Sequence, residues 1–119
     1  MGDYRNLLVW RKAMLLTETV YRATETFPRS ELYGLTSQLR RAAVSIPSNI
    51  AEGQGRGYDG QFVQFLRNAR GSLLELETQV ILSTRLGYLE PPLEGEILAF
   101  TREIGKLLNG LSKSIAKPS

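Results

Sequence analysis

Apolar side chains recur at steps of three and four residues through four long segments of this 119-residue chain. That spacing places them on one face of an α-helix, and it predicts amphipathic helices over about residues 6–26, 35–53, 60–86 and 92–116. Proline or glycine stands at every break, at Pro28, among residues 53–57, at Gly87 and at Pro91. Four such helices with short connectors predict an all-α fold, an antiparallel up-and-down four-helix bundle that forms one domain over residues 1–119.

Each helix contributes one apolar stripe to the predicted core. Pro47 interrupts the second stripe, which resumes in helical phase at Ile50, so a kink is favoured over a complete break of the helix. Gly71 lowers helix propensity in the third helix, which indicates close approach of another backbone there. The stripes are Val9, Ala13, Leu16, Val20, Ala23 and Phe27; Leu35, Leu39, Ala42, Ala43, Ile46 and Ile50; Phe62, Phe65, Leu66, Ala69, Leu73, Leu76 and Val80; and Leu93, Ile97, Phe100, Ile104, Leu107, Leu108, Leu111 and Ile115.

The first and third helices carry more apolar residues than a single stripe needs. One explanation is that each helix contacts two neighbours inside the bundle. The other is that part of this apolar surface is an interface between subunits of an oligomer. The candidate interface residues are Leu8, Trp10, Leu15, Val63 and Ile81.

The residue types that are missing limit the chemistry of the chain. It contains no histidine and no cysteine, which excludes thiolate and imidazole metal sites and catalysis by Ser-His or Cys-His pairs. Any remaining chemistry would have to use carboxylates, Lys/Arg, Tyr or Ser, and these form no convincing acid–base pair or nucleophile, so we expect neither an enzyme nor a cofactor. The apolar runs are too short for a membrane span or an export signal, and we expect a cytoplasmic protein without a membrane partner.

A polar stripe accompanies the apolar stripe of the second helix, and another follows the third helix. If the two stripes face each other, Arg41 meets Glu75 or Glu52 and the amides and hydroxyls complete hydrogen bonds. We interpret this set as a structural network that fixes helix register or a subunit seam; a ligand-binding or catalytic pocket is the alternative. The candidate network consists of Gln38, Arg41, Ser45, Asn49, Glu52 and Glu75.

The chain is mildly basic, with a net charge of +3 and a pI near 9.4. Residues 1–70 hold ten Lys/Arg against six Asp/Glu, and residues 71–119 hold five against six. Arg67 and Arg70 are neighbours on the third helix, and Arg56 lies in the glycine-rich turn before it. These three and Arg40 are the candidate nucleic-acid-binding residues, as phosphate contacts; a solvated surface is the alternative.

Several motifs of the chain occur together in a known family. The most specific are Arg41-Ala-Ala-Val-Ser-Ile-Pro47 and Asn49-Ile-Ala-Glu-Gly53, followed by Gly55-Arg-Gly57 and the run from Gly71 to Gln79. With these motifs the chain resembles the bacterial four-helix bundle proteins encoded by intervening sequences in 23S rRNA genes. The resemblance covers nearly the whole length.

The resemblance implies a ring-shaped homopentamer and kinship to the accessory variability determinant of diversity-generating retroelements. That relative is a basic pentamer that engages nucleic acid and a reverse transcriptase, so RNA, DNA and a nucleic-acid-processing protein are the implied partners. We therefore expect a non-enzymatic oligomeric scaffold associated with nucleic acid. The alternative is a protein-interaction adaptor whose bundle groove accepts a partner helix without binding nucleic acid.

Overall fold

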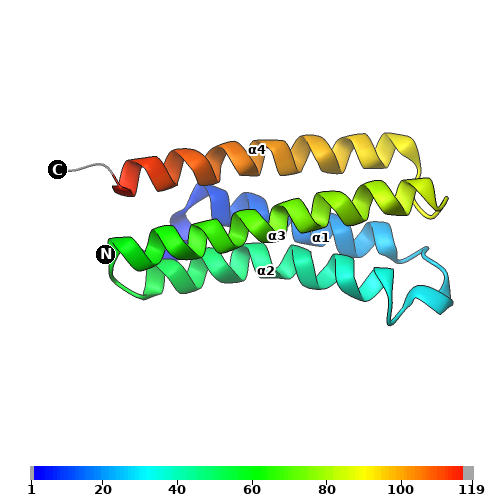
Figure 1. Ribbon diagram of the computed structural model, residues 1–119, viewed down its shortest axis with the longest axis horizontal. Coiled ribbons are helices and arrows are strands. Elements are labelled where there is room, and N and C mark those ends of the chain that lie inside the picture. Colours follow the sequence, from blue (N-terminus) through cyan, green and yellow to red (C-terminus); the bar gives the residue numbers. More distant parts are fainter. Residues whose placement is uncertain (1, 117–119) are drawn as a thin grey trace.

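Each apolar segment forms one continuous α-helix in the computed structural model, which describes residues 2–116 (Figure 1). Successive helices run in opposite directions along a rod of 50 × 23 × 20 Å, and the described residues contain no strand. The prediction of an all-α fold with four helices is confirmed. The helices are α1 (Leu8–Thr24), α2 (Leu35–Gly55), α3 (Asp59–Arg85) and α4 (Pro91–Ala116), with short 3-10 helices at Tyr4–Asn6 and Arg29–Glu31.

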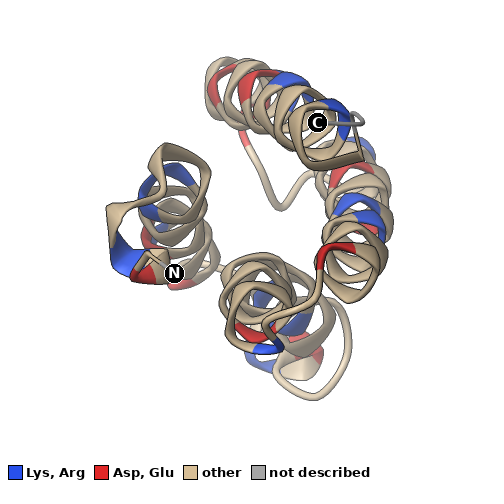
Figure 2. Ribbon diagram, turned by 90° about the vertical axis from the view of Figure 1, so that its left-hand side faces the viewer, with Lys and Arg blue, Asp and Glu red and all other residues tan. Residues whose placement is uncertain are grey.

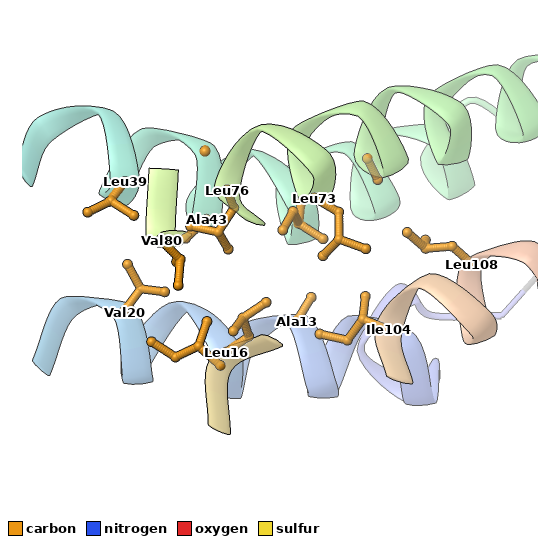
Figure 3. Close-up of a cluster of buried hydrophobic side chains, with 14 of the residues drawn as sticks. Ala13, Leu16, Val20, Leu39, Ala43, Leu73, Leu76, Val80, Ile104 and Leu108 are labelled. Carbon is orange, nitrogen blue, oxygen red and sulfur yellow. The ribbon is translucent and has the colours of Figure 1, made fainter. Parts of the chain in front are cut away.

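The core lies along the axis of the rod, where the four apolar stripes meet (Figure 3). Contact is most extensive between α2 and α3 and least extensive between α1 and α4. Because α1 has 17 residues and α4 has 26, α1 covers only part of α4. Leu107 and Leu111 of the α4 stripe are half-buried and line an open groove with residues 7–9 at the start of α1, whereas Ile97, Ile104 and Leu108 are fully buried.

Pro47 lies inside an unbroken α2 and is itself buried. A proline has no N–H, so the carbonyl of Ala43 loses the donor that a helix normally supplies four residues later. Thr17 of α1 supplies a donor there, because its hydroxyl lies 3.1 Å from the carbonyl oxygen of Ala43 and 2.8 Å from that of Ala13, and its one proton is shared between the two. A side chain of the neighbouring helix therefore satisfies the backbone where the proline disrupts it.

Gly53 is the glycine that permits close approach between two helices. A Cβ added to Gly53 would lie 2.6 Å from Cβ of Phe65 on α3, whereas one added to Gly71 would meet nothing within 4 Å. The expectation that Gly71 faces another backbone is therefore wrong, because Gly71 lies on the exposed side of α3. Near the end of α2, any larger residue at position 53 would push α3 away.

Glu31 joins three parts of the chain at one end of the rod. Its two carboxylate oxygens accept hydrogen bonds from the amide of Leu35, at the start of α2, and from the hydroxyl of Tyr88, at 3.0 and 3.2 Å. Burial, and secondly this bond to Glu31, raises the pKa of Tyr88. Gly87 has a φ of +81° and closes α3, with its own amide and that of Tyr88 donating to the carbonyls of Thr84 and Ser83.

Charge is distributed unequally along the rod. When each helix is divided at its middle, one half comprises residues 2–15, 45–72 and 104–116 and holds eight Lys/Arg against three Asp/Glu. The other half, residues 16–44 and 73–103, holds six against nine. Figure 2 views the basic half end-on, from the side that carries the N-terminus and the end of α4. Within the described residues, no helix is long and apolar enough to cross a membrane.

Candidate nucleic-acid interface

A basic groove runs along the surface between α3 and α4, from the basic half of the rod to just beyond its middle. It consists of two adjoining depressions of about 280 and 250 Å³ that share Arg70 and Asn109. Its floor is aliphatic and includes Val63, Leu66 and Leu108. We call this surface the basic groove and define it by its five cations, Arg67, Arg70, Arg102, Lys106 and Lys113.

The spacing of the cations along α3 and α4 explains why they line both sides of the basic groove. Arg67 and Arg70 are three residues apart on α3, and both lie on the exposed surface of the helix, away from its buried apolar stripe. On α4, Arg102, Lys106, Asn109 and Lys113 fall within about 60° of arc at 100° per residue. The antiparallel order of the two helices then brings Lys113 to the same depression as Arg67 and Arg70.

No cation of the basic groove belongs to an ion pair of the described residues; those pairs join Arg5 to Asp3, Lys12 to Glu103 and Arg56 to Glu52. Glu103 lies beside Arg102 and Lys106 in a neighbouring depression, where its carboxylate pairs with Lys12. One carboxylate, that of Glu77, lines the groove at the end facing the acidic half. It accepts a 2.6 Å hydrogen bond from the buried hydroxyl of Thr101. The positive charge of the groove is thus largely uncompensated by the protein, so a polyanion would supply the missing charge.

Of the four predicted nucleic-acid contacts, the structure brings Arg67 and Arg70 together and places the other two elsewhere. Arg40 donates to the hydroxyl of Thr24 at 2.9 Å and stacks 4.7 Å from the ring centre of Tyr21, which ties α2 to α1. Arg56 forms its 2.8 Å ion pair with Glu52 and lies over the ring of Phe65. Both guanidinium groups therefore already have partners within the protein.

The cations of α4 were missed by the sequence reasoning, although a signal for them exists. Arg102, Lys106 and Lys113 share one helical face, which periodicity alone reveals. Periodicity does not reveal that this face borders the side of α3 that carries Arg67. That neighbourhood depends on whether the four helices follow one another clockwise or anticlockwise around the bundle axis.

Only part of the predicted polar network forms. The hydroxyls of Ser45 and Ser72 lie 2.8 Å apart across α2 and α3, and the amide of Asn49 donates to the hydroxyl and carbonyl of Ser45. Glu52 pairs with Arg56, four residues along the same helix, and not with Arg41. Gln38, Arg41 and Glu75 are exposed, and none of their side chains forms a hydrogen bond or ion pair with another described residue.

The five candidate interface residues fall into two groups. Leu8, Leu15 and Ile81 are 53%, 50% and 37% exposed, so each leaves apolar area on the surface of a single chain. Trp10 and Val63 are half-buried instead. Trp10 packs against Tyr4, with ring centres 5.2 Å apart, and Val63 lines the basic groove.

The fold and this surface define a small four-helix bundle protein with one strongly basic end. The chain belongs to the 23S rRNA-intervening sequence protein family, which it matches over residues 5–110, and the predicted resemblance is thereby confirmed. It is also similar to the crystal structure of a protein of unknown function of the S23 ribosomal protein family from Bacteroides thetaiotaomicron. That similarity has a TM-score of 0.79 and 23% identity, covers 89% of this chain and 99% of the other, and shows the fold. Comparison with curated proteins gives no match.

Proposed function

We propose that this protein is a non-enzymatic, oligomeric scaffold that associates with RNA or DNA through the basic groove. The observation that carries the proposal is the alignment of five cations along one groove, with a single carboxylate among the lining residues. Lysine and arginine that neutralise phosphates release condensed counterions, which favours binding of any nucleic acid irrespective of sequence. The homopentamer that the family resemblance implies would repeat the basic groove around a ring and multiply its charge.

The proposal is tested by fluorescence anisotropy with labelled RNA and DNA at about 50 mM salt. We expect binding by the natural chain and a loss of at least tenfold in affinity for Arg67→Gln/Arg70→Gln, because two phosphate contacts disappear. Arg22→Gln/Arg85→Gln is the matched control, since both arginines are exposed and lie in the acidic half. No binding by the natural chain, or equal losses in both variants, would contradict the proposal.

A second candidate function is an adaptor that accepts a partner helix between α1 and α4. It is favoured by an apolar groove of about 300 Å³ lined by Leu7, Leu8, Val9, Leu107, Gly110 and Leu111, together with Lys106. Leu8→Glu would close this groove to an apolar helix, because a carboxylate at its edge opposes burial. If the natural chain fails to bind nucleic acid at about 50 mM salt, the adaptor is the favoured function.

A further inference from the structure

We propose that the basic groove binds double-helical nucleic acid in preference to single strands. This inference rests on the proposed function and names the form of nucleic acid that the same groove takes. It follows from the kinds of side chain that line the groove and from the spacing of its charges.

The first argument concerns aromatic side chains. Sequence-tolerant binding of a single strand relies on aromatic rings that stack on successive bases. Every residue that lines the basic groove is aliphatic, charged, or a small polar residue or glycine. The exposed tyrosines lie elsewhere: Tyr21 is covered by Arg40, and Tyr33 and Tyr58 precede α2 and α3. A single strand in this groove would therefore lack its main stacking contribution.

The second argument concerns charge density. Arg102 and Lys113 are eleven residues apart on α4, which corresponds to about 16 Å along the helix. A DNA duplex presents about one charge per 1.7 Å of its axis, and each separate strand about one per 3.4 Å. Over the length of the groove a duplex thus offers roughly ten phosphates and one strand roughly five. Because the duplex has the higher charge density, each phosphate that a cation neutralises releases more condensed counterions, about 0.9 against about 0.7 for a single strand, and this favours the duplex.

The polar residues between the cations suit the same ligand. Asn109 is shared by both depressions, and Ser112 lies three residues further along α4. An amide and a hydroxyl donate to phosphate oxygens, and such contacts fix the position of a duplex without reading its bases. We therefore expect little dependence on base sequence.

The test compares duplex DNA, duplex RNA and a polypyrimidine single strand of equal length, each over a range of salt concentrations. We expect the duplexes to bind at least about tenfold more tightly at 100 mM salt. If all five cations contact phosphates, the logarithm of the affinity for duplex DNA falls with the logarithm of salt with a slope of about −4.5, against about −3.5 for the strand. That slope means a loss of about 500-fold between 50 and 200 mM salt.

Two variants of equal charge locate the site. Arg67→Gln/Arg70→Gln/Lys113→Gln reduces the magnitude of the duplex slope by about 2.7. Arg22→Gln/Arg29→Gln/Arg85→Gln leaves it unchanged, because those exposed arginines lie in the acidic half. Circular dichroism and the midpoint of thermal unfolding establish that both variants fold.

The outcomes separate this inference from the proposed function. Single strands that bind as tightly as duplexes would overturn the preference for duplexes and leave nucleic-acid association intact. Equal slopes in the two variants would show that duplexes bind outside the groove. Displacement of the duplex by poly-glutamate at equal charge concentration would identify the groove as a site for acidic polypeptide, which also overturns the inference. Failure to bind any of the three probes would remove the proposed function itself.

Discussion

Thr17 and Pro47 form a compensating pair at the contact between α1 and α2. The hydroxyl of Thr17 supplies the hydrogen bond that Pro47 cannot give to the carbonyl of Ala43. A buried carbonyl left without a donor costs about 1–3 kcal/mol. The proline is therefore tolerated in a buried helix because Thr17 of the neighbouring helix places its hydroxyl beside the carbonyl oxygen of Ala43.

We predict that Thr17→Val lowers the free energy of unfolding by about 1–3 kcal/mol. The loss should be smaller in a Pro47→Ala background, because the amide of the new alanine can donate to Ala43. Urea denaturation of the four members of this double-mutant cycle measures the coupling. Thr19→Val is the control, since the hydroxyl of Thr19 bonds only to the carbonyl of Leu15 on its own helix. Identical losses from Thr17→Val in both backgrounds would contradict the prediction.

At the scale of single elements, replacing Gly53 of α2 and Gly71 of α3 by alanine should change the free energy of unfolding in opposite directions. Gly71→Ala should raise the free energy of unfolding by about 0.5–1 kcal/mol, because the site is open and alanine favours the helix. Gly53→Ala should lower it by about 1–3 kcal/mol, because the new Cβ collides with Phe65. Thermal and urea unfolding measure both changes. Stabilisation by Gly53→Ala would mean that α2 and α3 separate without cost.

The helices themselves were predictable, and the contacts between their flanks were only partly so. The periodicity of α1 to α4 specifies which side of each helix is buried, since burial follows the apolar stripe. It does not specify whether a given flank meets the preceding or the following helix. For this reason Ser45 was correctly paired with α3, whereas Arg41 was assigned a carboxylate partner that it does not meet.

The candidate nucleic-acid contacts illustrate the same limit. Arg67 and Arg70 were recognised because they are close in sequence, but their partners on α4 are more than thirty residues away in the chain. Arg40 looked equally free in the sequence, and a long side chain can reach a neighbouring helix in a way that no spacing rule foresees. Along the sequence the positive charge favours residues 1–70, whereas in the fold it gathers in one half of the rod.

For the whole molecule, we predict self-association through the exposed apolar residues of α1. Native mass spectrometry of the natural chain should give about five times the mass of 13.3 kDa, as expected for a homopentamer. Leu15→Glu should shift the assembly toward single chains, because Leu15 is half exposed and a carboxylate there opposes burial. Leu32→Glu, at an equally exposed leucine in the connector between α1 and α2, should leave the assembly intact. A natural chain that stays at 13.3 kDa would contradict the prediction.

The unequal halves of the rod have a consequence for any such ring. Cyclic symmetry relates copies by rotation about one axis, so rods that stand along this axis all point the same way and their like ends lie side by side. A ring of chains in that orientation would have one rim of strongly positive potential and an opposite rim of negative potential. A polyanion would be drawn to the first rim and repelled by the second, and it would approach the assembly from one side. Two surfaces of opposite sign would also let a basic partner occupy the far rim while nucleic acid is held on the near one.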